Sequence, residues 1–369
     1  MTLESVSSSI CENLSTLFIH DPSQLLSDQT SEQRIAEIVR KSSETLPSDL
    51  RDRVWSEFFD VGPLDALLND QSITEVMVTG ASSIYFERSG KLKKHEDKFL
   101  SDLSFRNFIQ RVCREANVIP TLDAPFVDGT WRSWRLHMAI PPSVPSPTLT
   151  LRRHPDNPWT FNDLKNSGWA SPAATDYLIE LVRQKKNFLI IGSTGSGKTS
   201  VLNACLQETE VNERSILIED TSELRVPNAV STKLLTRRDP HRILRDIDQS
   251  ELLKQSLRMR PDRLVMGEIR GGEAKDLLMA FATGHSGCMG TLHAENARQA
   301  LIRLEMLIQI GAAQWSLQAV RTLILLSLQA VVVVKKDSDG KRKLDGIYKI
   351  ASLEEVGFLL ERVFTEGKN

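Results

Sequence analysis

The stretch Asn187-Phe-Leu-Ile-Ile-Gly-Ser-Thr-Gly-Ser-Gly-Lys-Thr-Ser-Val-Leu-Asn-Ala204 joins an apolar run to a glycine-rich turn and then to a helix-forming segment. It satisfies every fixed position of the pattern G-x-x-x-x-G-K-[ST], in the strand–turn–helix context that the pattern requires. Gly192, Gly195 and Gly197 can adopt backbone angles that a side chain would hinder, so successive N–H groups can point at a phosphate chain. We interpret residues 192–199 as a phosphate-binding loop. The alternative is a chance glycine-rich connection between a strand and a helix.

The residues expected to bind nucleotide are those of the loop itself: Gly192, Ser193, Thr194, Gly195, Ser196, Gly197, Lys198 and Thr199. Lys198 is expected to reach the β- and γ-phosphates. Thr199 stands in the first turn of the following helix, where its hydroxyl can bind Mg²⁺ while the helix N-terminus attracts the same anion. The expected ligands are therefore ATP and Mg²⁺.

Composition limits the possible classes of protein. With 369 residues the chain is long enough for two domains, and its formal net charge of −2 gives no overall positive field, so we expect no direct binding of nucleic acid. The four cysteines are scattered and form no C-x-x-C pair, which argues against a disulfide framework or a zinc site and favours the cytoplasm. The N-terminus has no basic and apolar regions of a secretory signal. The longest apolar run, 323–334, is shorter than the roughly 20 residues of a membrane-spanning helix.

The sequence predicts four segments: a polar lead-in with amphipathic helices at 1–60, an α+β domain at 61–153, a linker at 154–160, and the domain with the phosphate loop at 161–369. In the last of these, apolar strands alternate with helices, which is typical of a largely parallel sheet covered by helices. Its predicted strands are 188–191, 215–219, 263–266, 290–293 and the four-valine run 331–334. Its predicted helices are 161–164, 172–183, 199–206, 252–258 and 273–282.

In the N-terminal α+β domain the sequence predicts fewer strands. Alternating residues indicate strands at 73–78, 83–88, 135–140 and 148–153, and a helix at 105–116. Helical spacing on either side of Pro47 predicts two amphipathic helices between residues 31 and 59, and a further short helix is expected at 62–70.

Hydrolysis needs carboxylates near the γ-phosphate, and two predicted strands end in acids. Ser215-Ile-Leu-Ile-Glu219 leads into an acidic cluster, and Arg263-Leu-Val-Met-Gly-Glu268 has Gly267 where many nucleotidases carry a metal-binding aspartate. Glu268 is therefore expected to bind the metal, alone or together with Glu219. An acid at the end of a strand can also be a surface or capping residue.

Together these segments resemble the secretion ATPases of the type II/type IV superfamily. Four motifs occur in that family's order: the phosphate loop, an Asp box at Ile218-Glu-Asp-Thr-Ser-Glu-Leu224, a Walker B region at Leu257–Glu273, and a His box at Thr283-Gly-His-Ser-Gly-Cys-Met-Gly-Thr-Leu-His293. Within the superfamily, the segments Thr74–Gly80, Ile140–Pro142, Leu151–Arg153 and Arg237-Arg238 look most like the tight-adherence (Cpa/Tad) pilus assembly ATPase. The chain departs from that pattern at Val127–Trp134 and in its polar N-terminus.

The resemblance implies an α/β fold, with the N-terminal α+β domain followed by a RecA-like P-loop NTPase domain. It also implies catalytic roles for Glu219, Glu268 and His293, with Thr199 and Glu268 as metal ligands. Arg135, Arg152 and Arg153 resemble the family's arginine fingers. Histidines in such a segment can instead be polar core residues, and arginines on an exposed strand can simply solvate that face.

From this resemblance we expect a hexameric motor in the cytoplasm, at the inner face of the cytoplasmic membrane. It would couple ATP hydrolysis to assembly of a Tad or type IV-like pilus, with retraction of the pilus as a further expected activity, or to secretion, and its partner would be an inner-membrane platform protein. The alternative within the superfamily is the ATPase of a conjugative or effector-delivering type IV system. Alternatives of another class are a DNA translocase and a scaffold that binds ATP without turnover.

Overall fold

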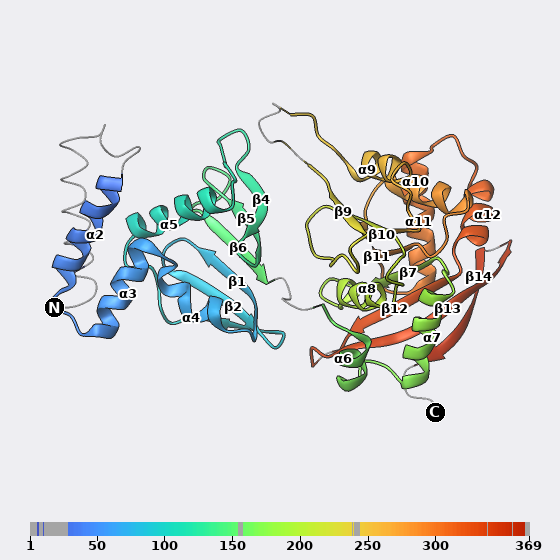
Figure 1. Ribbon diagram of the computed structural model, residues 1–369, viewed down its shortest axis with the longest axis horizontal. Coiled ribbons are helices and arrows are strands. Elements are labelled where there is room, and N and C mark those ends of the chain that lie inside the picture. Colours follow the sequence, from blue (N-terminus) through green and yellow to red (C-terminus); the bar gives the residue numbers. More distant parts are fainter. Residues whose placement is uncertain are drawn as a thin grey trace. The chain divides into compact units, whose positions relative to one another are not determined.

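The computed structural model divides the chain into two compact units, Met1–His154 and Pro155–Asn369 (Figure 1). It describes residues 6, 10, 29–153, 158–237, 239, 244–337, 339–355 and 357–365. Of the predicted polar lead-in, residues 1–28 lie outside the described residues except for Val6 and Ile10. Both units combine helices with a sheet, which confirms the predicted α/β class.

The N-terminal unit contains an antiparallel six-stranded sheet of order β3-β2-β1-β6-β5-β4. Its strands are β1 (Ile73–Thr79), β2 (Ser83–Arg88), β3 (Lys91–Lys94), β4 (Phe126–Trp131), β5 (Trp134–Ala139) and β6 (Thr148–Arg153). Its described helices are α2 (Gln29–Ser43), α3 (Ser48–Phe59), η2 (Gly62–Leu64), α4 (Asp65–Asn69) and α5 (Asp102–Glu115). The strands and helices predicted for this region are confirmed, with small changes in their ends.

The two edge strands of this sheet, β3 and β4, were not expected from the sequence. β3 reads Lys-Leu-Lys-Lys and all four residues are exposed, so it lacks the apolar alternation that signals a half-buried strand. Lysines are common on such edges because they hinder pairing with another chain. Sheet position, not periodicity, therefore determines this strand.

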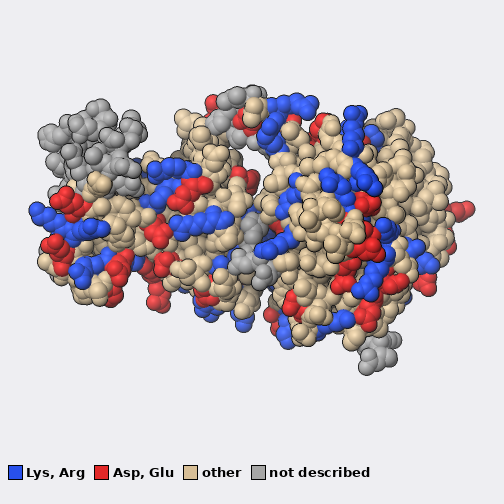
Figure 2. Space-filling view, in the orientation of Figure 1, with Lys and Arg blue, Asp and Glu red and all other residues tan. Residues whose placement is uncertain are grey.

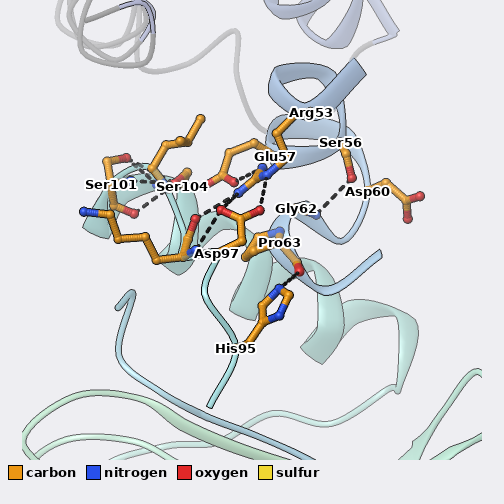
Figure 3. A network of polar contacts seen from close by, with 12 residues as sticks. Arg53, Ser56, Glu57, Asp60, Gly62, Pro63, His95, Asp97, Ser101 and Ser104 are labelled. Carbon is orange, nitrogen blue, oxygen red and sulfur yellow. Dashed lines mark hydrogen bonds and ion pairs between the residues drawn. The ribbon is translucent and has the colours of Figure 1, made fainter. Parts of the chain in front are cut away.

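A buried carboxylate joins helix α3 to the N-terminus of α5 (Figure 3). Glu57 is 0% exposed; its Oε2 lies 2.6 Å from Nη1 of Arg53, and its Oε1 accepts hydrogen bonds from the backbone N–H of Leu100, at 2.8 Å, and from the hydroxyl of Ser104. Arg53 also pairs with Asp97 at 2.7 Å. Because its neighbours satisfy the carboxylate on both oxygens, Glu57 has a structural role.

The second unit contains an eight-stranded sheet of order β14-β13-β12-β7-β11-β10-β8-β9, in which the six strands from β12 to β9 are parallel. The strands are β7 (Phe188–Gly192), β8 (Ser215–Glu219), β9 (Thr232–Leu235), β10 (Arg263–Ile269), β11 (Met289–His293), β12 (Ala330–Lys336), β13 (Arg342–Glu354) and β14 (Gly357–Thr365). The helices are α6 (Phe161–Asn166), α7 (Pro172–Arg183), α8 (Lys198–Gln207), α9 (Gln249–Ser256), α10 (Glu273–Ala282), α11 (Ala297–Gly311) and α12 (Leu317–Ser327). The predicted parallel sheet is confirmed.

Successive residues of the central strands enter two separate cores. Leu189 and Ile191 of β7 pack in the core formed with α9 to α12, whereas Phe188 and Ile190 pack in the core formed with α6, α7 and α8. Helices therefore cover both faces of the sheet (Figure 1). Burial on both faces explains why these strands read as continuous apolar runs in the sequence. The valine run of β12 is buried as predicted.

Charged side chains of both signs are distributed over the molecular face drawn in Figure 2. The described lysines and arginines on this face alternate with aspartates and glutamates and form no continuous basic band. No described helix is both long enough and apolar enough to cross a membrane.

Candidate functional site

The predicted phosphate loop connects buried strand β7 to helix α8. Gly197 precedes the helix with a φ of 95°, and Gly195 has a φ of 73°, both in the left-handed region that favours glycine. A Cβ on Gly192 would lie 2.3 Å from the carbonyl oxygen of Val334 on neighbouring strand β12. These positions therefore require glycine, two for backbone conformation and one for the close approach of another strand.

Polar groups gather inside and beside this loop. Nζ of Lys198 donates to the carbonyl oxygens of Gly192 and Ser193, each at 3.1 Å. The hydroxyl of Ser196 is buried and has no hydrogen-bond partner among the described residues. Ser193 and Thr194 are exposed, and Thr199 is partly buried in the first turn of α8. A buried hydroxyl without a partner is unusual in a folded protein, and a ligand oxygen at this loop would satisfy it.

Sheet order brings the four predicted motifs to one edge. Strands β7, β11, β10 and β8 are consecutive neighbours and parallel, so their carboxyl ends lie side by side. His293, the last residue of β11, is directly paired with Gly192, the first residue of the loop. Glu268 lies near the end of β10, and Glu219 ends β8. Ligands of open parallel sheets bind beyond such carboxyl ends.

Glu219 is held closely by its surroundings. It is 3% exposed, and its Oε1 accepts hydrogen bonds from the backbone N–H groups of Glu223 and Leu224 at 2.9 and 2.8 Å. Its Oε2 lies 3.4 Å from Nζ of Lys233 and makes no hydrogen bond with the described residues. Burial raises the pKa of this carboxyl above its ordinary value, although the Glu223 N–H and the Lys233 charge act in the opposite direction.

Glu268 is more accessible and belongs to a chain of charges. Its Oε2 accepts a hydrogen bond of 2.5 Å from Nη2 of Arg270, whose Nη1 lies 3.5 Å from Asp220. Arg270 therefore connects the Walker B region to the acidic cluster after β8. The carboxylates of Glu268 and Asp220 are groups that can bind a metal, and Arg270 lies between them.

The two histidines differ in their surroundings. His293 is half-buried at the strand end beside the loop, whereas Nδ1 of His285 lies 3.2 Å from the carbonyl oxygen of Ala280 at the end of α10. Thr291, buried two residues before His293, donates a hydrogen bond of 2.6 Å to the carbonyl oxygen of Gly267. The tertiary structure thus connects the His box to the Walker B strand.

The three predicted arginine fingers lie on neighbouring strands of the N-terminal unit. Arg135 of β5 is paired with Arg152 of β6, and Arg152 lies 3.6 Å from Glu75 of β1. Arg153 donates to the carbonyl oxygens of Leu68, Asp70 and Ile73 and stacks on Trp134 at 4.1 Å. Arg153 is thus bound to its own unit by three backbone contacts. Arg238, part of the predicted resemblance, lies outside the described residues.

Sequence reasoning assigned no role to several groups that contact the site. These groups are Lys233 beside Glu219, Thr291 beside Gly267 and Arg342 on the phosphate loop, and the strands of Lys233 and Arg342 carry no catalytic motif. Only Thr291 stood inside a recognised segment, the His box. Among the described residues no group of three or more His, Cys, Asp or Glu side chains could by itself hold a metal.

A parallel sheet with helices on both faces, a phosphate loop after its central strand, and acids and a histidine at adjacent strand ends define a P-loop nucleotide-binding protein. The family described as type II/IV secretion system protein matches residues 129–348. Because this match spans more than half of the chain, the protein belongs to that family.

Individual relatives agree with this membership. A putative conjugal transfer protein of Mycobacterium tuberculosis is 32% identical, covering 81% of this chain and 87% of its own length. The type IV secretion system protein PtlH of Bordetella pertussis is 30% identical, covering 77% of this chain and 92% of its own.

Two solved structures share the fold. The Legionella pneumophila ATPase DotB gives a TM-score of 0.57 at 19% identity, covering 81% of this chain and 82% of that one. The pilus retraction motor PilT with bound ADP gives 0.51 at 19% identity, covering 79% and 78%.

Proposed function

We propose that this protein is an ATP hydrolase that drives a secretion or pilus machine as a ring of identical chains. The observation that carries the proposal is the convergence of four strand ends: the phosphate loop after β7 shares one edge of the sheet with His293, Glu268 and Glu219, and His293 is paired with the first residue of the loop. Membership in the type II/IV secretion system family supports the same activity.

The residues of the loop fit a nucleoside triphosphate with Mg²⁺. The Cβ position of Gly195 is open, the buried Ser196 hydroxyl lacks a partner among the described residues, and the Lys198 ammonium lies at the loop carbonyls, near the expected phosphates. Thr199 and Glu268 would hold the metal, which when bound neutralises phosphate charge. Lys198 would bind the β- and γ-phosphates, because its positive ammonium group makes charge-assisted hydrogen bonds with negative phosphate oxygens.

The remaining side chains would act on water and on the γ-phosphate. Glu268 is accessible enough to orient a water molecule as well as the metal, and Glu219 would support it from the neighbouring strand. His293, next to Gly192 in the sheet, would detect the γ-phosphate. Arg135 and Arg152 are proposed as fingers from the N-terminal unit, and Arg153 remains a candidate whose backbone contacts favour a structural role.

Two substitutions test the catalytic proposal. Lys198→Ala should abolish phosphate release, because it removes the charge that neutralises the β- and γ-phosphates. Glu268→Gln should keep nucleotide binding but stop turnover, because the amide keeps the shape and loses control of metal and water. Exposed Lys349 on β13 offers a matched control, and Lys349→Ala should hydrolyse ATP normally. Phosphate release at the wild-type rate from Lys198→Ala would contradict the proposal.

A hexameric ring is the proposed assembly. Six chains of 41.5 kDa would give a particle of about 250 kDa, and head-to-tail contacts that close produce such rings. If neighbouring sites are coupled, a minority of Glu268→Gln subunits should inhibit wild-type rings out of proportion to their number. Light scattering that finds a fully active monomer, together with a linear loss of activity on mixing, would contradict both the ring and the coupling.

Two kinds of membrane apparatus are candidates for the machine that the ring drives. The motifs at Thr74–Gly80 and Leu151–Arg153 favour assembly of a Tad-type pilus on an inner-membrane platform protein, with the ring at the cytoplasmic face of the membrane. The names of the Mycobacterium and Bordetella relatives favour a conjugative or effector-delivering type IV system. Identification of the membrane protein that copurifies with the ring would distinguish them, and stimulation of hydrolysis by DNA would instead favour a translocase.

A further inference from the structure

An arginine far away in the sequence contacts the phosphate loop. Arg342 begins strand β13, where it is paired with Lys336 at the end of β12. Because β12 runs parallel to β7 and lies next to it, the turn between β12 and β13 is at the same edge of the sheet as the loop. Arg342 and Gly195, which lie 147 residues apart, are thereby brought together.

Two contacts join this side chain to the loop. Nε of Arg342 donates a hydrogen bond of 3.0 Å to the carbonyl oxygen of Gly195. Its aliphatic stem covers Gly197, because a Cβ on that glycine would lie 3.1 Å from Cδ of Arg342. The arginine therefore contacts both glycines whose φ angles are positive in this turn.

The base of the side chain is firmly supported. Leu344, two residues further along β13, is 4% exposed, and its backbone N–H donates to the carbonyl oxygen of Trp169 at 2.9 Å. Trp169 is itself buried in the core that contains α6, α7 and α8. Arg342 thus reaches the loop from a strand whose beginning is bound to β12 and to the backbone of Trp169.

The glycine-rich turn of the loop needs a contact that restricts its conformation. Glycine loses more conformational freedom on ordering than any other residue, so a turn rich in glycine has many alternative conformations. Nothing lies within 4 Å of the Cβ position of Gly195, so side-chain packing does not restrain that residue. A charged donor at its carbonyl oxygen restrains it instead and adds positive charge beside an anion site.

We propose that Arg342 is a positioning residue of the phosphate loop, which holds the Gly195–Gly197 turn in the conformation that binds the phosphate chain. This inference rests on the proposed function, because it assigns the residue to ATP binding at that site. The residue acts through the backbone of the loop and touches no reacting atom. Its loss should therefore weaken nucleotide binding and leave the chemical step nearly unchanged.

Three variants separate the hydrogen bond from the packing. Arg342→Met keeps the stem over Gly197 and removes the donor, whereas Arg342→Lys keeps a charged donor of different geometry. The control is Arg362→Met, because Arg362 on β14 is also exposed and also donates to backbone carbonyls, those of Asp345 and Phe364. KM for ATP, kcat, and the Kd of a fluorescent ADP analogue would be measured for each, together with the thermal unfolding midpoint.

For Arg342→Met, KM for ATP and the Kd of the analogue should rise about tenfold, as expected for loss of a charged hydrogen bond, with kcat within about twofold of wild type. Arg342→Lys should recover part of the affinity. Arg362→Met should match wild type, and all unfolding midpoints should agree. Unchanged KM and Kd in Arg342→Met would overturn the inference, as would a large fall in kcat at constant KM.

Failure of the inference can be distinguished from failure of the proposed function. If Arg342→Met behaves as wild type while Lys198→Ala is inactive, the ATPase assignment stands and the role of Arg342 is overturned. If wild-type protein binds the analogue without hydrolysing ATP, hydrolysis is contradicted, and the change in Kd still tests Arg342. If wild-type protein binds no nucleotide, both proposals are overturned.

Discussion

A Cβ on Gly267 would lie 2.9 Å from Cγ of Glu219. The two residues stand on neighbouring parallel strands, β10 and β8, and the carboxylate side chain of one passes over the bare backbone of the other. Many nucleotidases have an aspartate at this position of the Walker B strand. In this protein a side chain there would collide with Glu219, so the missing aspartate and the buried glutamate are two parts of one arrangement.

Gly267→Ala should therefore displace Glu219 and lower kcat by roughly 10- to 100-fold, because small displacements of positioned groups carry large kinetic costs. ATP binding should remain, since the phosphate loop is on another strand. Steady-state phosphate release and binding of a fluorescent ADP analogue would measure the two effects. The effects of Gly267→Ala and Glu219→Gln should also be non-additive in the double variant, because both act through one carboxylate. Additive losses would mean that Gly267 acts elsewhere.

Substitution of Arg153 should destabilise the N-terminal unit much more than substitution of Arg152. Arg153 bonds to three backbone carbonyls and stacks on Trp134, so Arg153→Met should destabilise the N-terminal unit by roughly 3 kcal/mol. Arg152 is 48% exposed and 3.6 Å from Glu75, so Arg152→Met should change stability by about 1 kcal/mol or less. Hydrogen exchange of amides in β5 and β6 measures both. Equal protection in the two variants would contradict the structural role of Arg153.

Arg135 or Arg152, if either is a finger, should affect catalysis without affecting folding. Single Ala variants should lower kcat by roughly 10³ to 10⁵ with a small change in ATP affinity, because the guanidinium stabilises charge that develops in the transition state. Rapid-quench measurement of phosphate release would provide the rate. Normal kcat in both variants would exclude them as fingers.

A buried ion pair supports the opposite end of the central sheet. Arg263 is 1% exposed; its Nε donates to Glu213 at 2.6 Å and its Nη2 donates to the carbonyl oxygen of Val182 at 2.8 Å. Arg263→Met should destabilise the second unit by about 3 kcal/mol, because among the described residues it leaves the buried carboxylate of Glu213 with Lys185 as its one remaining ion-pair partner. The control is the more exposed pair of Lys165 and Asp176, where Lys165→Met should cost about 1 kcal/mol or less. Urea denaturation would measure the unfolding free energy of both variants. Equal losses in the two variants would contradict a stabilising role for the buried Arg263–Glu213 pair.

Folding stability should depend on pH through Glu219. Its pKa is raised by burial, so the folded protein holds the proton more tightly than the unfolded chain. The stability that this group contributes is then greatest below the ordinary carboxyl pKa and falls as pH rises through the raised value. Because Glu219→Gln does not titrate, its unfolding free energy relative to wild type should increase as the pH rises above the ordinary carboxyl pKa and through the raised one. A difference that is independent of pH would contradict the raised pKa.

Local sequence determined the elements and the identity of the loop. The apolar run of β7, the glycines after it and the lysine and threonine at the start of α8 are contiguous, so backbone preference and chemistry can be interpreted without knowledge of the fold. The acids at the ends of β8 and β10 were recognisable for the same reason. Strand β3 was not recognisable from the sequence, because its residues are all exposed at the edge of the sheet and show no alternation of apolar and polar side chains.

Only the tertiary structure decided which of these residues meet. Sheet order brings His293 next to Gly192, the approach of two strands excludes a side chain from Gly267, and a hairpin near the end of the chain brings Arg342 to Gly195. These relationships depend on register and packing between residues far apart in sequence, and a local pattern does not record them. The sequence alone therefore indicated a candidate phosphate loop with acids on other strands, while packing of the sheet brought the ends of those strands to one edge.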